Sequence, residues 1–169
     1  MARGRAPGAK RSFGFEKLKV FDPELWKKTR NQKMESPSSA PLQIFGSDND
    51  PRVLGDARRN IAAAGVDRWV KLEQADILER PAPAPGGVMI ANPPYGERIG
   101  SKEELAEFYP KLGSALKKNY SGWRCHFFTA DLRLPKLMRL QPARRVPLFN
   151  GALECRLYEF RMVAGSNRR

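Results

Sequence analysis

Apolar residues recur along the chain with two alternating spacings, one typical of strands and one typical of helices. Four short apolar runs predict strands: 42–45, 70–75, 88–91 and 124–129. The run 88–91 is unbroken, which predicts a strand buried on both faces of a parallel sheet. Two arms at 145–149 and 153–163, joined by Asn150-Gly151, predict a closing antiparallel hairpin. Strands that alternate with helices predict an α/β fold, mostly parallel, with an antiparallel C-terminal hairpin.

Caps and prolines indicate where the predicted helices begin and end. Asp50 followed by Pro51 predicts a helix start, and Gly65 predicts its end. Pro110 lies inside the apolar stripe of a later helix, which continues past it, so a kink is expected rather than an end. Pro135 is expected to interrupt a short helical stretch around it.

Length and composition exclude several classes of protein. A chain of 169 residues, 41% hydrophobic and 29% charged, is long enough for one ordinary domain and is not compositionally disordered. No segment has the ~20 consecutive apolar residues that span a bilayer. The two cysteines, Cys125 and Cys155, lie far apart and His126 is the single histidine, so we expect neither a disulfide scaffold nor a metal site. A reducing cytoplasm fits this cysteine usage.

The net charge of +13 is distributed unevenly. Residues 1–35 hold ten Lys and Arg against four acidic residues, residues 36–116 nine against eleven, and residues 117–169 twelve against three. A near-neutral middle between basic ends predicts a small-molecule site flanked by surface that attracts a polyanion, although solvated helix faces and tails explain such charges as well. The expected organisation is a basic arm and helix (1–40), a main domain (41–165) and a tail (166–169).

The sharpest chemical signal is Asn92-Pro93-Pro94-Tyr95, directly after an unbroken apolar run. An exocyclic amine on a nucleobase is a poor nucleophile because its lone pair is delocalised into the ring. The side-chain oxygen of Asn92 and the backbone carbonyl of Pro93 are two acceptors that can orient such an amine. The two prolines restrict the loop, so little entropy is lost on binding, and Tyr95 offers a flat face to an unstacked base. A proline-stiffened turn without chemistry is the simpler alternative.

Two acidic residues at other predicted strand ends indicate a nucleotide-like ligand. Asp48 ends a strand just before a helix, where an acidic residue commonly binds ribose hydroxyls. Asp76 ends the next strand, and its carboxylate can accept a hydrogen bond from an adenine amine while Ile77 covers the ring. Each aspartate alone is also an ordinary turn residue. Because ligands of parallel sheets bind beyond the carboxyl ends of the strands, Asp48, Asp76 and the Asn92 loop together predict one site.

Longer stretches around these residues resemble a known enzyme family. The stretches are 6–16, 44–52, Asn60, Asp76, 92–100 and 149–153. They resemble the S-adenosyl-L-methionine-dependent methyltransferase domain of bacterial large-subunit rRNA guanine methyltransferases that carry a THUMP domain, and the resemblance covers nearly the whole chain. The Asn-Pro-Pro-Tyr motif is shared with DNA amino-methyltransferases and release-factor glutamine methyltransferases. The extension Gly-Glu-Arg-Ile-Gly at 96–100 is what points to the rRNA group.

The resemblance implies a Rossmann-like class I methyltransferase sheet and a role for each matching residue. It implies a catalytic loop formed by Asn92, Pro93, Pro94 and Tyr95. It implies S-adenosyl-L-methionine as the cofactor, bound by Asp48, Asn49, Asp76, Ile77 and Asn92. It implies large-subunit rRNA as the partner, contacted by Tyr95, Gly96 and Arg98, with a guanine exocyclic amine as the methyl acceptor in direct in-line attack.

One feature of the family is not found in the sequence. The opening strand and its Gly-x-Gly cofactor loop belong immediately before Ala6, and no such loop occurs elsewhere. We therefore expect a C-terminal fragment with an incomplete sheet, which binds S-adenosylmethionine weakly and has little activity as residues 1–169 alone. An incomplete sheet leaves an edge or apolar face open to pairing with a second copy of the chain.

Two other functions fit the same residues. The methyl acceptor can instead be a DNA adenine or a protein glutamine amide, in which case methyl label appears on DNA or on release factor. The chain can also be a non-catalytic basic module that binds RNA or a partner chain through its two positive ends. That function predicts salt-sensitive RNA binding that survives loss of Tyr95.

Overall fold

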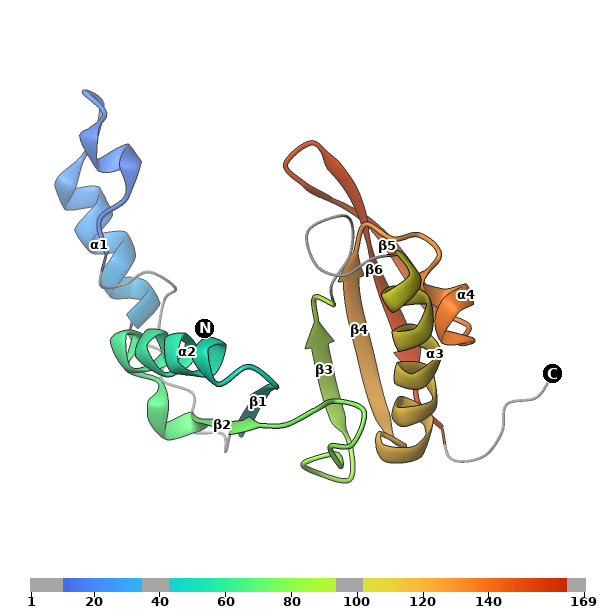
Figure 1. The fold of residues 1–169 in the computed structure, drawn as a ribbon. Helices are drawn as coiled ribbons and strands as arrows, with labels where there is room; N and C mark the ends of the chain where they lie inside the picture. Colours follow the sequence, from blue (N-terminus) through green and yellow to red (C-terminus); the bar gives the residue numbers. More distant parts are fainter. Residues whose placement is uncertain (1–10, 35–42, 94–101, 164–169) are drawn as a thin grey trace. The chain divides into compact units, whose positions relative to one another are not determined.

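A computed structural model describes residues 11–34, 43–93 and 102–163 (Figure 1). The chain divides into two compact units, Met1–Gln74 and Ala75–Arg169, and each unit is described by itself. The expected organisation into 1–40, 41–165 and 166–169 stays a prediction.

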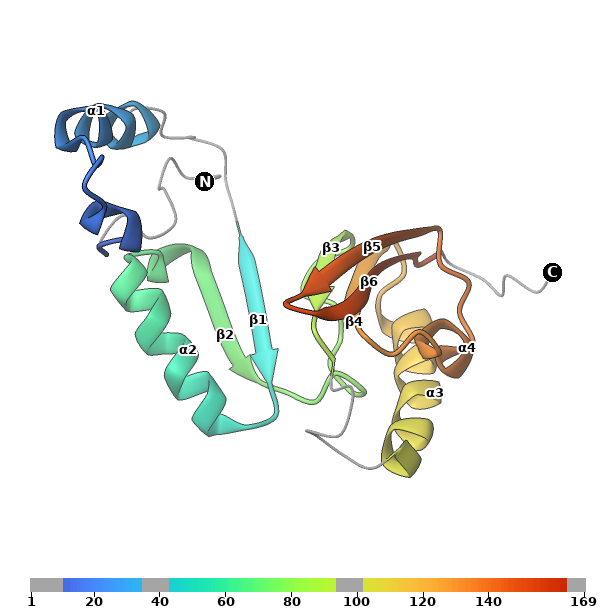
Figure 2. The same cartoon turned by 90° about the horizontal axis from the view of Figure 1, so that it is seen from above.

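The first unit contains one helix packed along a two-stranded parallel sheet. Its elements are η1 (Gly14–Lys17), α1 (Pro23–Met34), β1 (Ile44–Asp48), α2 (Pro51–Ala64), η2 (Asp67–Trp69) and β2 (Val70–Gln74). Strands β1 and β2 pair in parallel, with Ile44 opposite Val70 and Asp48 opposite Gln74. Helix α2 runs beside these two strands (Figure 2). The segment from β1 through α2 to β2 is a β-α-β unit. Neighbouring parallel strands need such a crossover connection, which α2 provides here.

The ends of α2 follow directly from the sequence. The side chain of Asp50 accepts a hydrogen bond from the backbone N–H of Arg52 at 2.8 Å, and Pro51 is the first helical residue. Gly65 ends the helix with φ 64°, a left-handed conformation that glycine adopts without steric cost. The predicted start and end of this helix are confirmed.

The second unit is a four-stranded sheet with two helices on one face. Its elements are β3 (Gly87–Ala91), α3 (Lys102–Asn119), β4 (Trp123–Thr129), α4 (Leu134–Met138), β5 (Arg144–Asn150) and β6 (Leu153–Arg161). The strand order is β3-β4-β6-β5, with β3 parallel to β4 and the other two pairings antiparallel. Helices α3 and α4 lie on the same side of this sheet in both views (Figures 1 and 2). The α/β fold with parallel strand pairs and an antiparallel C-terminal hairpin is confirmed.

The hydrophobic core of this unit lies between α3, α4 and the covered face of the sheet. The fully or almost fully buried side chains come from both helices and the sheet and include Tyr109, Leu112 and Leu116 of α3, Leu134 and Met138 of α4, Cys125 and Phe127 of β4, and Phe160 of β6. The Trp123 indole N–H donates to the Ala84 carbonyl at 2.9 Å, which ties the segment before β3 to the sheet. Both cysteines are buried free thiols.

The predicted burial of 88–91 on both faces is wrong. Met89 packs against the core, but Val88 is 50% exposed and Ile90 is 77% exposed. Their side chains alternate with that of Met89, and α3 and α4 cover only the face on which Met89 lies. Within the described part of this unit, no helix covers the other face (Figure 2).

Two local predictions also need correction. Pro135 does not interrupt a helix but stands in the first turn of α4, where its missing N–H costs no hydrogen bond. The hairpin turn is Gly151-Ala152, because Asn150 pairs with Leu153, and only Gly151 has a positive φ, 63°. A glycine at the first turn position is typical of a type II′ turn. Helix α3 continues through Pro110 as predicted.

Candidate functional site

The end of β3 presents an exposed amide next to a buried proline. The last residue pair of the parallel ladder joins Ala91 to Phe127, so Asn92 and Pro93 come directly beyond it. Asn92 is exposed and Pro93 is buried. Burial of the rigid proline ring fixes the backbone at this point, while the amide of Asn92 stays accessible to a ligand. Two groups of the predicted site, the Asn92 side chain and the Pro93 carbonyl, therefore stand at the carboxyl edge of the sheet.

The remaining residues of the predicted loop lie outside the described residues. These are Pro94, Tyr95, Gly96 and Arg98. Their catalytic and substrate-binding roles stay predictions.

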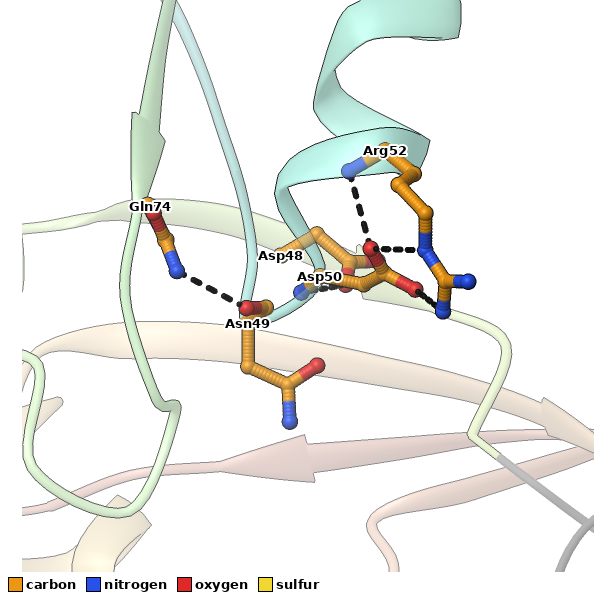
Figure 3. A network of polar contacts seen from close by, with 5 residues as sticks. All are labelled: Asp48, Asn49, Asp50, Arg52 and Gln74. Atoms are coloured by element: carbon orange, nitrogen blue, oxygen red, sulfur yellow. Dashed lines mark hydrogen bonds and ion pairs between the residues drawn. The ribbon is translucent and has the colours of Figure 1, made fainter.

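The end of β1 leads into a tightly hydrogen-bonded turn (Figure 3). One carboxylate oxygen of Asp48, Oδ1, accepts a hydrogen bond from the Asp50 backbone N–H at 2.8 Å. The carbonyl of Asn49 accepts from the Gln74 side chain of β2 at 3.1 Å. These bonds hold Asp48 in one orientation at the carboxyl end of β1, and its half-buried carboxylate keeps a second oxygen for a ligand.

An exposed ion pair closes the same turn. The Arg52 guanidinium donates to both carboxylate oxygens of Asp50, with Nη2 to Oδ2 at 2.8 Å. This hydrogen bonding is the main cause that lowers the pKa of Asp50. Arg52 is largely exposed, so the pair contributes little to stability and acts by fixing the start of α2.

Asp76 forms a turn after β2 and keeps its carboxylate exposed. Its Oδ1 accepts from the Leu78 backbone N–H at 2.8 Å, and its carbonyl accepts from the backbone N–H groups of Glu79 and Arg80. The neighbouring Ile77 is half-buried against the core of the second unit. The turn role expected as the simpler alternative for Asp76 is therefore present, and its exposed carboxylate is also available to a ligand.

The three predicted strand ends belong to two units. Asp48 lies in the first unit, and Asp76 and Asn92 lie in the second. Their convergence on one ligand stays a prediction.

The end of β4 carries a polar group that the sequence analysis missed. Thr129 is completely buried, and its hydroxyl accepts from the Asp131 backbone N–H at 3.0 Å. The Asp131 carboxylate accepts from the backbone N–H of Arg133 at 2.9 Å and from its guanidinium at 2.9 and 3.0 Å. This hydrogen bonding with Arg133 is the main cause that lowers the pKa of Asp131. The available signal was the Asp-x-Arg spacing directly after a strong strand pattern.

Asp131 and Arg133 stand at the same sheet edge as Asn92. Strands β3 and β4 are parallel neighbours, so residues that follow them emerge at one edge. Burial, and secondarily the charge of Asp131, raises the pKa of the Tyr109 hydroxyl in α3 to about 12. The edge thus combines an exposed amide with an ion pair.

His126 lies within β4, as predicted, and pairs with β6. Its Nε2 is 3.8 Å from an oxygen of Glu159, and hydrogen bonding to Arg161 is the main cause that lowers the pKa of Glu159. Among residues 11–34, 43–93 and 102–163, no three His, Cys, Asp or Glu side chains gather into a possible metal site. Across the same ranges, every helix is too short or too polar to cross a bilayer.

The chain is similar to methyltransferases in sequence and in structure. Residues 1–159 match the family UPF0020, described as RMKL-like, methyltransferase domain. A protein named ribosomal RNA large subunit methyltransferase K/L from Shewanella baltica is 36% identical over 174 residues, which are 100% of this chain and 24% of that protein. A protein of the same name from Aeromonas salmonicida is 36% identical over 187 residues, 98% of this chain and 26% of that protein.

A solved structure shares the fold. The crystal structure of SMU.472 complexed with SAH matches 97% of this chain and 44% of that chain, with a TM-score of 0.82 and 29% sequence identity. The chain spans only about a quarter of the length of the curated relatives named above, 24% and 26%. Because the family match extends over 1–159 and the relatives align with nearly the entire chain, the chain belongs to the RMKL-like methyltransferase domain family.

Proposed function

We propose that this chain forms part of the catalytic domain of an enzyme. This enzyme transfers a methyl group from S-adenosyl-L-methionine to a guanine exocyclic amine of large-subunit rRNA. The observation that carries the proposal is the exposed Asn92 amide beside the buried Pro93, directly beyond the last pair of the β3–β4 ladder. The names of the relatives from Shewanella baltica and Aeromonas salmonicida support an rRNA substrate. An rRNA substrate also supports the cytoplasm as the site of reaction.

The proposed chemistry needs little from the protein beyond orientation. When bound, S-adenosylmethionine supplies an electrophilic methyl group. Asn92 Oδ1 and the Pro93 carbonyl each accept one hydrogen of the guanine amine, which draws the nitrogen toward tetrahedral geometry and directs its lone pair. The surplus amine proton leaves to solvent, so no second base is required. Tyr95, Gly96 and Arg98 are proposed to hold the base and its strand on the basis of the resemblance.

The residues at the strand ends fit the proposed cofactor. Asp48 presents a carboxylate oriented by its bond to the Asp50 N–H, suited to ribose hydroxyls, and Asp76 presents an exposed carboxylate suited to an adenine amine. Asn49, Ile77 and Asn92 complete the proposed contacts. The bound SAH named for SMU.472, the product that remains after methyl transfer, supports this choice of cofactor.

Substitution of Asn92 tests the proposal. In the natural protein, Asn92→Ala is expected to lower kcat about 100-fold or more, the size typical of removing one group that acts in the transition state. The affinity for S-adenosylmethionine, measured by calorimetry, is expected to change much less. Asn31→Ala removes another exposed amide, from α1, and serves as the matched control. Unchanged turnover in Asn92→Ala would refute the proposed role.

We further propose that a second copy of the chain covers the open face of β3. Val88 and Ile90 expose apolar surface there, and β4 is the only strand that pairs with β3 within the described residues. Light scattering after size-exclusion chromatography is expected to show a dimer that Ile90→Lys dissociates. A monomer at all concentrations of the unsubstituted protein would contradict this pairing.

A further inference from the structure

The β5–β6 hairpin extends past the carboxyl edge of the sheet (Figure 1). Strand β4 ends at Thr129, opposite Arg156 of β6. Three further residues of β6, 153–155, continue the ladder with β5 alone. At about 3.4 Å per residue, the hairpin therefore reaches roughly 10 Å beyond the end of β4. The hydrophobic core cluster of this unit includes none of residues 148–155, although Cys155 itself is buried.

The tip of this hairpin, residues 148–153, exposes apolar side chains. Phe149 is 70% exposed, and Leu148 and Leu153 are also exposed. Farther from the turn on β6, Cys155 and Tyr158 are buried. The type II′ turn requires a glycine at position 151 but does not require an aromatic residue two positions earlier. The turn therefore does not explain Phe149, and an exposed aromatic ring has a full face available for stacking.

Cations lie on the same hairpin as the exposed ring, but nearer its base. Arg144 and Arg145 are exposed on β5, opposite Glu159 and Tyr158 of β6. Arg156 is partly neutralised by Glu154, with Nη2 to Oε1 at 2.6 Å. The hairpin itself, residues 144–161, holds four arginines against two glutamates, so its net charge is positive. This positively charged surface is complementary to a polyanion rather than to an uncharged apolar partner.

The tip stands near the proposed methyl-acceptor position. Within the second unit, β5, which carries Phe149, is three strands from β3. With about 4.8 Å between neighbouring strands, the lateral separation is roughly 14 Å. Asn92 follows β3 at the same edge past which the hairpin projects. A base oriented by Asn92 thus has its neighbouring nucleotides within reach of Phe149.

We propose that the hairpin tip binds the RNA strand beside the target nucleotide, with Phe149 stacked on a flanking base. This inference rests on the proposed function, because it assumes an RNA substrate at Asn92. An aromatic ring combined with exposed arginines is the combination that binds unstacked single strands, the ring through the base and the cations through the phosphates. Through this contact, the hairpin selects the conformation of the RNA strand that the enzyme binds.

Fluorescence anisotropy with a labelled single-stranded RNA of twelve mixed-sequence nucleotides tests the contact in the natural protein. Phe149→Ala is expected to weaken binding about tenfold, which is the low-to-middle range for removing one stacked base contact. Phe149→Leu keeps an apolar side chain without a ring and is expected to bind as weakly as Phe149→Ala, whereas Phe149→Trp retains affinity. Val163→Ala, at a residue 57% exposed beyond the other end of β6, is the control and leaves affinity unchanged.

Equal RNA affinity of Phe149→Ala and the unsubstituted protein would overturn the inference. Full affinity of Phe149→Leu would also overturn it, because stacking requires a ring. Loss of self-association in Phe149→Ala with unchanged RNA affinity would assign the tip to a protein interface instead.

Methyl transfer to an unmethylated rRNA transcript separates this inference from the proposed function. If the natural protein methylates guanine but Phe149→Ala leaves KM for RNA unchanged, the inference alone fails. If the natural protein methylates no guanine, the proposed function fails.

Discussion

Two helical glycines are expected to respond to alanine with opposite signs. Gly113 lies in α3 where this helix meets the end of α4, and a Cβ atom built there stands 3.0 Å from the carbonyl carbon of Met138 and closer still to its oxygen. The atoms in contact are backbone atoms, so no side chain can rotate away. Gly55 lies in α2, and its added Cβ meets only the end of the Arg59 side chain at 3.7 Å, an ordinary contact.

The expected magnitudes follow from two competing effects. Replacing glycine by alanine inside a helix stabilises it by about 1 kcal/mol through backbone entropy. At Gly55 little opposes this gain, so Gly55→Ala is expected to stabilise the first unit by about 0.5–1 kcal/mol. At Gly113 the clash forces α4 away from α3 and loosens the buried Leu134 and Met138. Overpacking of this kind costs about 1–3 kcal/mol or more, so Gly113→Ala is expected to destabilise the second unit by about 2 kcal/mol.

Hydrogen exchange resolved by peptide mass spectrometry measures each unit separately. Exchange in α3, α4 and β4 is expected to accelerate in Gly113→Ala, while exchange in α2 slows in Gly55→Ala. Urea unfolding followed by circular dichroism gives the corresponding shifts in midpoint. A Gly113→Ala protein as stable as the unsubstituted protein would show that α3 and α4 do not approach as closely as described.

Two further predictions concern buried or paired ionisable groups. Burial raises the pKa of the Cys125 thiol from 9.0 to about 12, so its contribution to stability is complete below pH 9 and is lost as the pH rises toward 12. Cys125→Ala is therefore expected to show a shallower loss of stability between pH 9 and 11 in urea unfolding, and an unchanged slope would contradict this. Arg133 lowers the pKa of Asp131, so the stabilisation from this carboxylate is present above pH 3.8 and is lost as the pH falls through the lowered pKa. Because Arg133 is largely exposed, Asp131→Asn is expected to cost no more than about 1 kcal/mol at pH 7, and a much larger loss of thermal stability would contradict that size.

Local signals in the sequence were reliable where one residue type satisfies a specific backbone requirement. Asp50, Pro51 and Gly65 each meet such a requirement at an end of α2, and the structure places all three as predicted. The hairpin was also predicted, but its turn was placed one residue too early. A glycine can serve as the first or the second residue of a tight turn, and only the pairing of Asn150 with Leu153 distinguishes the two.

Burial and long-range contacts could not be predicted in the same way. The run 88–91 is apolar throughout, yet an apolar pattern does not reveal whether helices cover one face or both, and Ile90 is largely exposed. The Asp131–Arg133 pair was missed because its position beside Asn92 depends on the pairing of β3 with β4. For the candidate site, the residues at the strand ends were identifiable from chemistry and spacing, and their convergence stays a prediction.

Identification of the methylated product tests the central claim most directly. The natural protein would be incubated with methyl-labelled S-adenosyl-L-methionine and, in separate reactions, with an unmethylated large-subunit rRNA transcript, genomic DNA and a release factor. Digestion and mass spectrometry are expected to find the label as N2-methylguanosine in the rRNA, and to find almost none in reactions of Asn92→Ala. Label found instead in N6-methyladenine of DNA or in methylglutamine, or equal N2-methylguanosine from Asn92→Ala, would contradict an rRNA guanine methyltransferase that orients its acceptor amine at the end of β3.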